Sequence, residues 1–305
     1  MAGRLTWDKL LSEDRTRMDS GKAKDNPFRN EFEADYDRIV GSSSVRRLQD
    51  KAQVFPLQEN DFTRTRLTHS VEVSALARSL GKAVGKELEK IDAENFTAEK
   101  TEKLASLLQV AGLIHDLGNP PFGHYGETVI REWFKRWFEN DYKIFERTRA
   151  NLKDQVLLNQ QEKNDFIFFD GNVQNLRIVT KLQTLNDEYG ANFTYGTLST
   201  IIKYPWSSVS KEDADKFGYF ASEGDIIQKL WEKTGLSEGI RHPATYLLEA
   251  ADDIIYICDD IEDGVKKGYI CWKDEYTDLQ NKFKEQQCYV DLFHMISSKK
   301  TDDNM

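Results

Sequence analysis

The sequence predicts an all-α fold, on three observations. Apolar residues recur at spacings of three and four in several long segments, as they do in helices with one buried face. Proline and glycine stand where some of those segments would begin or end. A single short apolar segment, residues 164–171, could be a strand or a buried turn. We therefore expect a helical bundle with small irregular or β elements.

Four long helices follow from this pattern. They cover residues about 69–90, about 101–117, a segment that starts near Gly126, and about 244–266. Pro120 and Pro121 prevent the second helix from continuing, and Pro243 opens the fourth. A further helical stretch is expected to end at residues 203–206. The polar segments expected to be surface loops are residues 88–101 and 207–225.

Composition excludes several classes of protein. With 39% hydrophobic and 31% charged residues in 305, the chain is too apolar to be disordered and too polar for a membrane protein. No apolar run approaches the roughly 20 residues that span a bilayer. The first residues are charged and lack the apolar middle of a signal peptide. We expect one domain over residues 1–305, with its core in about 30–270.

Charge and cysteine content suggest the kind of partner and the cellular compartment of the protein. The net charge of −10 argues against wrapping of DNA by the whole surface, but it does not exclude a local basic pocket for a small anion. Cys258, Cys271 and Cys288 are odd in number and suggest no disulfide framework. We therefore expect a cytoplasmic protein without a membrane partner.

Histidine and aspartate meet at the end of the second predicted helix. His115 is followed at once by Asp116, and His69 stands at the start of the first predicted helix. Adjacent residues on a helix project about 100° apart, so both members of the pair reach one ion only near the helix edge. By itself such a pair is more often a core histidine with a capping aspartate.

An acidic face lies on the fourth predicted helix. Asp252, Tyr256, Asp260 and Asp263 share a face about 80° wide, and the residues around it are largely apolar. Buried carboxylates need partners, which a divalent metal and basic groups would supply. The alternative is an acidic stripe that faces the solvent.

Two imidazoles and two carboxylates would form a mixed nitrogen and oxygen site. Such a set suits a first-row divalent ion or magnesium, with positions left open for water and substrate. A closed structural zinc site would more often use cysteine. An open metal site of this kind polarises a phosphoryl oxygen or activates water.

Several segments together resemble a known family. They are RRLQDKAQVFPL (46–57), RTRLTHSVEV (64–73), HDLGNPPFGHYGE (115–127), FDGNVQNLRIVTKLQ (169–183), IIKYPW (201–206) and EAADDIIYICDDIED (249–263). In this order they are similar to the blocks of the deoxyguanosine triphosphate triphosphohydrolases, a family of HD-domain phosphohydrolases. The resemblance covers about residues 30–270. It implies metal-dependent hydrolysis of a deoxynucleoside triphosphate, dGTP being favoured, to the deoxynucleoside and inorganic triphosphate.

The resemblance also implies roles for the site residues. The metal ligands would be His69, His115, Asp116 and Asp252, and the metal Mn²⁺ or Mg²⁺, with Fe²⁺, Co²⁺, Ni²⁺ or Zn²⁺ as alternatives. Asp252 is preferred to its neighbour Asp253 because it matches the first aspartate of the family motif. His124 would act as base or activator of the attacking group, oriented by Glu127; alternatively it is a loop histidine bonded to nearby backbone.

Substrate contacts carry over from the same resemblance. Gln53, Tyr256 and Asp260 would contact the sugar, and Tyr256 would occupy the place of a ribose 2′-hydroxyl. Arg66 and Lys203 would offset the triphosphate charge, or they form ordinary surface salt bridges. Asn119 would shape the loop or touch phosphate, and Tyr204 would line the pocket.

The resemblance leaves other readings open. Relatives continue beyond this point, so the family's usual C-terminal part is expected to be absent or truncated here. A homo-oligomer, as a hexamer, and single-stranded DNA are partners that the family suggests. The competing functions are another HD phosphohydrolase, such as a nucleotidase or phosphodiesterase, and a nucleotide-sensing or DNA-binding protein with a vestigial metal site.

Overall fold

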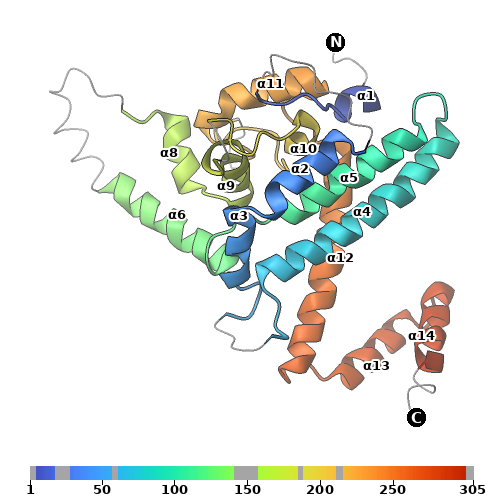
Figure 1. Ribbon diagram of the computed structural model, residues 1–305. Helices are drawn as coiled ribbons and strands as arrows, with labels where there is room; N and C mark the ends of the chain where they lie inside the picture. Colours follow the sequence, from blue (N-terminus) through green and yellow to red (C-terminus); the bar gives the residue numbers. More distant parts are fainter. Residues whose placement is uncertain are drawn as a thin grey trace. The chain divides into compact units, whose positions relative to one another are not determined.

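The computed structural model describes residues 5–17, 28–56, 61–140, 157–184, 188–210 and 216–299. Within these ranges the chain is helical, and β pairing is limited to two isolated bridges, Arg15 with Thr194 and Ala52 with Thr65 (Figure 1). The predicted all-α class with small irregular or β elements is therefore confirmed.

The chain divides into two compact units, residues 1–256 and 257–305. The elements of the first unit are α1 (Trp7–Leu10), α2 (Glu31–Val40), α3 (Ser43–Arg46), the 3₁₀ turn η1 (Arg47–Asp50), α4 (Arg66–Ile91), α5 (Ala98–Ile114), α6 (Gly123–Glu139), α8 (Gln160–Ile167), α9 (Gly171–Arg177), the π-helical turn η2 (Ile178–Leu182), α10 (Tyr195–Thr200), the 3₁₀ turn η3 (Ala221–Glu223) and α11 (Gly224–Thr234). Helix α12 (Pro243–Lys266) begins in the first unit and ends in the second, which also holds α13 (Trp272–Phe283) and α14 (Gln287–Lys299).

Helices α4 and α5 form a closely packed pair. A Cβ atom on Gly112 would lie only 2.7 Å from the Cα of Ser74, and one on Gly81 only 3.0 Å from the Cα of Ala105. Because these positions have no room for a side chain, the two backbones approach closely. The loop between the helices is short, so the start of α4 lies beside the end of α5 (Figure 1). This pairing brings His69 and His115 together.

Helix α5 is the centre of the core of the first unit. The apolar positions that define its predicted spacing are fully buried, and they are Leu104, Leu107, Leu108, Ala111 and Ile114. Helices α2, α4 and α10 pack around it. Burial on nearly all sides makes α5 a rigid support for the residues at its C-terminal end.

Capping fixes where α4 begins. The Thr65 side chain accepts a hydrogen bond from the Thr68 backbone N–H, and the Thr68 hydroxyl oxygen accepts one from the Thr65 N–H. This reciprocal pair satisfies two donors of the first turn. Arg66 and His69 are consequently held within the first turn of the helix.

Two of the sequence-based boundaries needed correction. Residues 164–171 do not form a strand, because α8 runs to Ile167, α9 begins at Gly171, and only residues 168–170 form a short turn between them. Asn159 caps the first of these helices and Asp170 the second, which explains the interruption between them. Helix α6 begins at Gly123 rather than near Gly126.

The loops predicted at 88–101 and 207–225 are shorter than expected. In the first, α4 continues to Ile91 and α5 starts at Ala98. The second includes η3 and the first residues of α11, and its residues 211–215 lie outside the described part. The fourth predicted helix, 244–266 opened by Pro243, agrees with α12.

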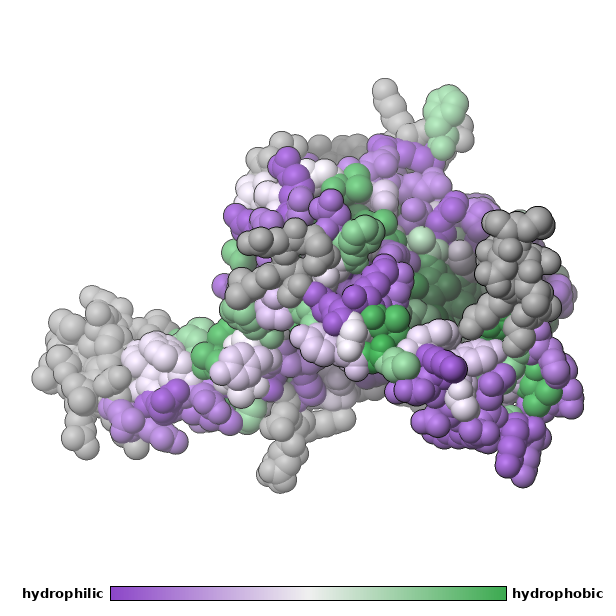
Figure 2. Space-filling model, turned by 90° about the horizontal axis from the view of Figure 1, so that it is seen from below, coloured by the Kyte–Doolittle hydropathy of each residue, from purple (hydrophilic) through white to green (hydrophobic). Residues whose placement is uncertain are grey.

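Hydrophilic and hydrophobic residues are mixed on the face of the molecule that Figure 2 shows. On α6 the exposed hydrophobic side chains are Tyr125, Val129 and Trp133. No described helix has the length and apolar character needed to cross a membrane.

The second unit is a small helical pair. The Tyr276 ring of α13 meets the Phe293 ring of α14 edge to face at 5.4 Å, and the Tyr276 hydroxyl donates to the Phe293 carbonyl at 3.3 Å. No residue of α13 is buried. The single domain predicted over 1–305 stays a prediction.

Candidate metal and phosphoryl-transfer site

Three elements bring four polar side chains together at one point. His69 comes from the first turn of α4, His115 and Asp116 follow the last residue of α5, and Asp252 comes from α12. Ligand atoms of His69, His115 and Asp116 lie within 4.8 Å of one another. Asp252 Oδ1 lies 3.1 Å from His69 Nε2 and 3.3 Å from His115 Nε2. The structure therefore joins the quartet that the sequence singled out.

The His115 ring is oriented so that its Nε2 faces negative charge. Its Nδ1 lies 2.7 Å from the Gly112 carbonyl, to which it donates. The lone pair of the neutral ring is then on Nε2, which is buried without a hydrogen-bond partner and faces Asp116 and Asp252. A lone pair beside two carboxylates requires a cation between them, which is either a proton or a metal. The donor set thus fits a divalent metal.

The pKa values of His115 and Asp252 reflect this arrangement of charges. Burial alone lowers the pKa of His115, but the carboxylates of Asp116 and Asp252 outweigh it and raise the pKa to about 9. Burial would raise the pKa of Asp252, yet the nearby His115 and His69 rings and Lys203 hold it well below its usual range. Both shifts favour positive charge at this site.

A shell of hydrogen bonds orients the ligands. The Asn119 side-chain amide donates to Asp116 Oδ1 at 2.6 Å, and the Arg66 guanidinium donates to Asp116 Oδ2. The Asn175 amide donates to the His115 carbonyl at 3.0 Å. Such partners fix the ring and carboxylate orientations that a metal would meet.

A histidine–glutamate pair stands at the start of α6. His124 Nδ1 lies 3.1 Å from Glu127 Oε2, and the His124 side chain is 87% exposed whereas that of Glu127 is buried. The hydrogen bond to Glu127 raises the pKa of His124. No described residue forms a hydrogen bond with His124 Nε2, so this atom is available to a ligand.

Glu127 is itself held from two sides. Its Oε1 accepts a hydrogen bond from the Gly171 backbone N–H at 2.7 Å, and its Oε2 lies 3.5 Å from Arg131. Arg131 also donates to the Phe169 carbonyl at 2.6 Å. The carboxylate consequently has one orientation in which to meet His124.

A strained turn links this pair to the quartet. Phe122 and Gly123 adopt φ values of 65° and 54°, and a Cβ atom on Gly123 would lie 2.7 Å from an Arg66 nitrogen. Left-handed backbone is unfavourable for phenylalanine and is often retained at functional sites. Arg66 therefore lies between Asp116 and the turn that carries His124.

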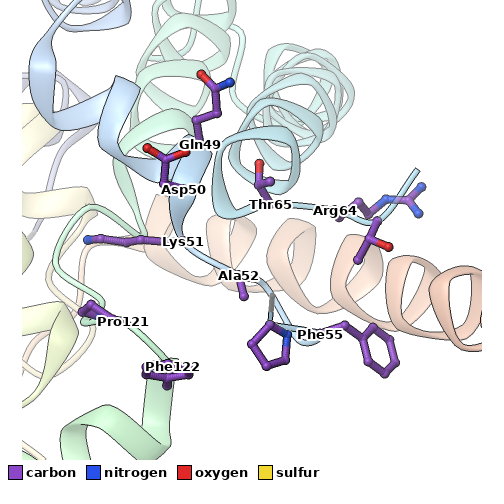
Figure 3. A pocket seen from close by; sticks show the side chains of 11 residues that line it. Gln49, Asp50, Lys51, Ala52, Phe55, Arg64, Thr65, Pro121 and Phe122 are labelled. Carbon is purple, nitrogen blue, oxygen red and sulfur yellow. The ribbon is translucent and has the colours of Figure 1, made fainter. Parts of the chain in front are cut away.

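Beside the turn is a pocket of about 300 Å³ (Figure 3). Lys51 extends along it toward the loop that carries Pro121, and Phe122 and Phe55 border it. The Lys51 ammonium donates to the Asn119 carbonyl at 2.7 Å. Burial lowers the pKa of Lys51. Lys51 thus supports the loop after Asp116.

The remaining predicted substrate residues differ in what the structure shows. Lys203 lies near the quartet, with its Nζ 3.5 Å from Asp252 Oδ2. Gln53 has a buried Oε1 without a hydrogen-bond partner, so it can still accept one from a ligand. Tyr204 follows Lys203, and Tyr256 is 47% exposed on α12, one turn after Asp252. Asp260 belongs to the second unit, so its role stays a prediction.

Sequence reasoning missed several residues that support the site. They are Lys51, Arg131, Gly171 and Asn175. Lys51, Gly171 and Asn175 lie in the segments that carry the resemblance, which was the available signal. Arg131 stands outside them and shows its role only through contacts in the fold.

Comparison with known proteins identifies an HD domain in this chain. A family model described as HD domain matches residues 66–168, which include His69, His115, Asp116, His124 and Glu127. Asp252 lies outside that match and joins the site through the fold.

Curated relatives extend the similarity. A deoxyguanosinetriphosphate triphosphohydrolase-like protein of Listeria innocua is 48% identical over 274 residues, which are 87% of this chain and 57% of the relative. One of Synechocystis is 39% identical, over 91% of this chain and 64% of the relative. A deoxyguanosinetriphosphate triphosphohydrolase of Salmonella paratyphi A is 32% identical, over 92% and 56%. The chain thus spans somewhat under two thirds of the length of these relatives.

Proposed function

Because this chain belongs to the deoxyguanosinetriphosphate triphosphohydrolase family of HD-domain proteins, we propose that it hydrolyses deoxynucleoside triphosphates with the help of a divalent metal. The products would be the deoxynucleoside and inorganic triphosphate, and dGTP would be the favoured substrate. The similarity to proteins that carry this name supports the substrate class.

The buried, partnerless Nε2 of His115 is the observation that carries the proposal. It faces two carboxylates, with His69 as a second nitrogen donor, and this set would hold a divalent ion. When bound, the ion would polarise a phosphoryl oxygen or lower the pKa of a water molecule. Mn²⁺ or Mg²⁺ is proposed, and Fe²⁺, Co²⁺, Ni²⁺ and Zn²⁺ are the alternatives for the same donor set.

His124 would be the general base or the activator of the attacking group. Its Nδ1 is occupied by Glu127, which fixes the tautomer and leaves Nε2 as the acceptor. A base in one orientation removes a proton from the attacking water more efficiently than a freely rotating one. Glu127 would also stabilise the imidazolium formed when His124 takes up the proton.

Basic and polar side chains would position the substrate. Lys203 and Arg66 would offset the negative charge of the triphosphate, because both lie at the quartet. Gln53 would contact the sugar through its Oε1. Tyr256 would pack on the sugar face and disfavour a ribose 2′-hydroxyl. Asn119 would shape the loop after Asp116, and Tyr204 would line the substrate pocket.

Product analysis tests the proposal. The purified chain is incubated with dGTP and Mn²⁺ or Mg²⁺, and the phosphate products are separated by ion-exchange chromatography. Deoxyguanosine together with inorganic triphosphate supports the proposal. Release of monophosphate or pyrophosphate would instead indicate another HD phosphohydrolase, and unchanged nucleotide would indicate a binding protein. A panel of the four dNTPs in the same assay reports base preference.

Assembly and location are part of the same proposal. We expect a homo-oligomer, as a hexamer, and a cytoplasmic enzyme, with single-stranded DNA as a further partner to be tested. The three cysteines are all free and exposed, as a reducing compartment would permit. Sedimentation velocity with and without a labelled single-stranded oligonucleotide tests both the homo-oligomer and DNA binding.

A further inference from the structure

Arg241 is enclosed by two tyrosine rings. Its guanidinium carbon lies 5.4 Å from the centre of the Tyr204 ring and 5.4 Å from that of the Tyr246 ring. One guanidinium nitrogen donates to Glu249 Oε2 at 2.8 Å. Both ring contacts fall within the range of cation–π attraction, so three partners define the position of this side chain.

These partners come from two segments that carry proposed site residues. Tyr204 directly follows Lys203, whose Nζ lies 3.5 Å from Asp252. Tyr246 and Glu249 lie on α12, ahead of Asp252 on the same helix. The Arg241 guanidinium therefore joins the segment of Lys203 to the helix of Asp252. A backbone hydrogen bond at 2.9 Å from Gly239 to the Pro205 carbonyl supports the same junction.

The charge of Arg241 is already engaged. Two rings lie against the guanidinium and one of its N–H groups donates to a carboxylate, so partners within the protein fix the position of this cation. A planar guanidinium stacks on rings and binds a carboxylate at the same time, which a lysine ammonium cannot reproduce. This arrangement suits a residue that holds two segments together, here called a brace, rather than a substrate ligand.

We propose that Arg241 is a positioning residue, which holds Lys203 and Tyr204 against α12 so that Lys203 meets the substrate phosphates beside Asp252. This inference rests on the proposed function, because it assigns Lys203 to the triphosphate. It adds a residue outside the HD-domain match at 66–168 to the machinery of the site.

A double-mutant cycle tests this role. Arg241→Met, Lys203→Met and the double variant are compared by kcat and KM for dGTP. We expect Arg241→Met to raise KM about tenfold, which is within the usual range for coupled neighbours, and to change kcat less. The double variant should match Lys203→Met alone, because Arg241 acts through Lys203. If the KM changes of the two single variants multiply in the double variant, the proposal is overturned.

Two further variants distinguish a brace from a general charge effect. Arg241→Lys keeps the charge and loses the stacked plane, so it should behave like Arg241→Met. Recovery of the parental KM by lysine would contradict the proposal. Arg177→Met is the matched control, because Arg177 also stacks on a ring, that of Phe220, and bonds to Ser222. Its KM should equal that of the parent.

The cycle remains informative in two difficult cases. If Arg241→Met does not fold, Tyr246→Leu and Glu249→Gln each remove one contact and enter the same cycle with Lys203→Met. If the parent does not hydrolyse dGTP, the proposed function fails, but calorimetry with inorganic triphosphate still compares the variants. Equal triphosphate affinity in the parent and the Arg241 variants would then contradict the positioning role of Arg241, independently of the proposed function.

Discussion

The Nε2 atom of His69 lies 3.1 Å from Oδ1 of Asp252, although the two residues are 183 positions apart. His69 is fixed by the first turn of α4, and Asp252 is presented by α12. Because the close packing of α4 on α5 places His115 beside them, the quartet depends on helix pairing as much as on the ligands.

Removing the proposed base should impair turnover and leave metal binding intact. His124→Ala is expected to lower kcat by about two to four orders of magnitude, the usual scale for a positioned acid–base group. Mn²⁺ affinity should match the parent, because His124 is not among the quartet. The measurement is dGTP turnover with parallel calorimetry. Turnover at the parental rate would remove His124 from the mechanism.

The close packing of α4 and α5 should be sensitive to a single methyl group. Gly112→Ala places a Cβ 2.7 Å from the backbone of Ser74, so the helices must shift. We expect the free energy of unfolding to fall by about 1–3 kcal/mol, as for other overpacked cores, and Mn²⁺ affinity to fall with it. Gly224→Ala, where nothing lies within 4 Å, is the control and should be neutral in urea unfolding. Equal stability of the two variants would contradict this packing argument.

Stability should depend on pH through His242. Burial lowers its pKa to about 4, and its ring donates to the Leu10 carbonyl and accepts from the Ala244 N–H. Since the unfolded chain binds a proton near pH 6.5 and the folded chain only near pH 4, the neutral ring stabilises the fold above pH 6.5. That contribution is lost as pH falls from 6.5 to 4, by about 3 kcal/mol.

The His242→Gln variant isolates this residue from the other titrating groups. Urea unfolding of parent and variant is measured at several values between pH 7 and pH 4. The stability of the variant should fall less steeply over this range. Parallel curves would show that His242 does not contribute to the pH dependence.

Sugar discrimination should depend on Tyr256. Tyr256→Ala is expected to reduce the preference for dGTP over GTP, because the ring would no longer exclude a 2′-hydroxyl. The ratio of kcat/KM for the two nucleotides is the measurement. An unchanged ratio would remove Tyr256 from the sugar pocket.

Much of the quartet could be predicted from the sequence because metal ligands are distinctive residue types. His69 and the His115–Asp116 pair stand out as histidines at helix ends, whereas Asp252 is one of several acidic residues on its helix and was singled out by its match to the family motif. Helix pairing at Gly112 could not be predicted, because a small residue by itself does not reveal what packs against it. The Gly171 N–H, which holds Glu127, is a backbone donor and leaves no side-chain signal.

The misassigned segment 164–171 has a similar cause. Its apolar run is compatible with both a strand and a helix. The deciding information is in the capping residues, Asn159 before α8 and Asp170 before α9. The proposed role of Arg241 shows the same limit, since Tyr246 and Glu249 are near it in sequence but Tyr204 meets it only in the fold.

Metal titration of a matched pair of variants tests the central claim most directly. Asp252→Asn removes a charged ligand and keeps the shape of the side chain, whereas Asp253→Asn makes the same change at the exposed neighbouring position of α12. The parent and Asp253→Asn should bind one Mn²⁺ per chain by calorimetry, and Asp252→Asn should lose that binding. Equal Mn²⁺ affinity in all three proteins would contradict a metal centre at His69, His115, Asp116 and Asp252.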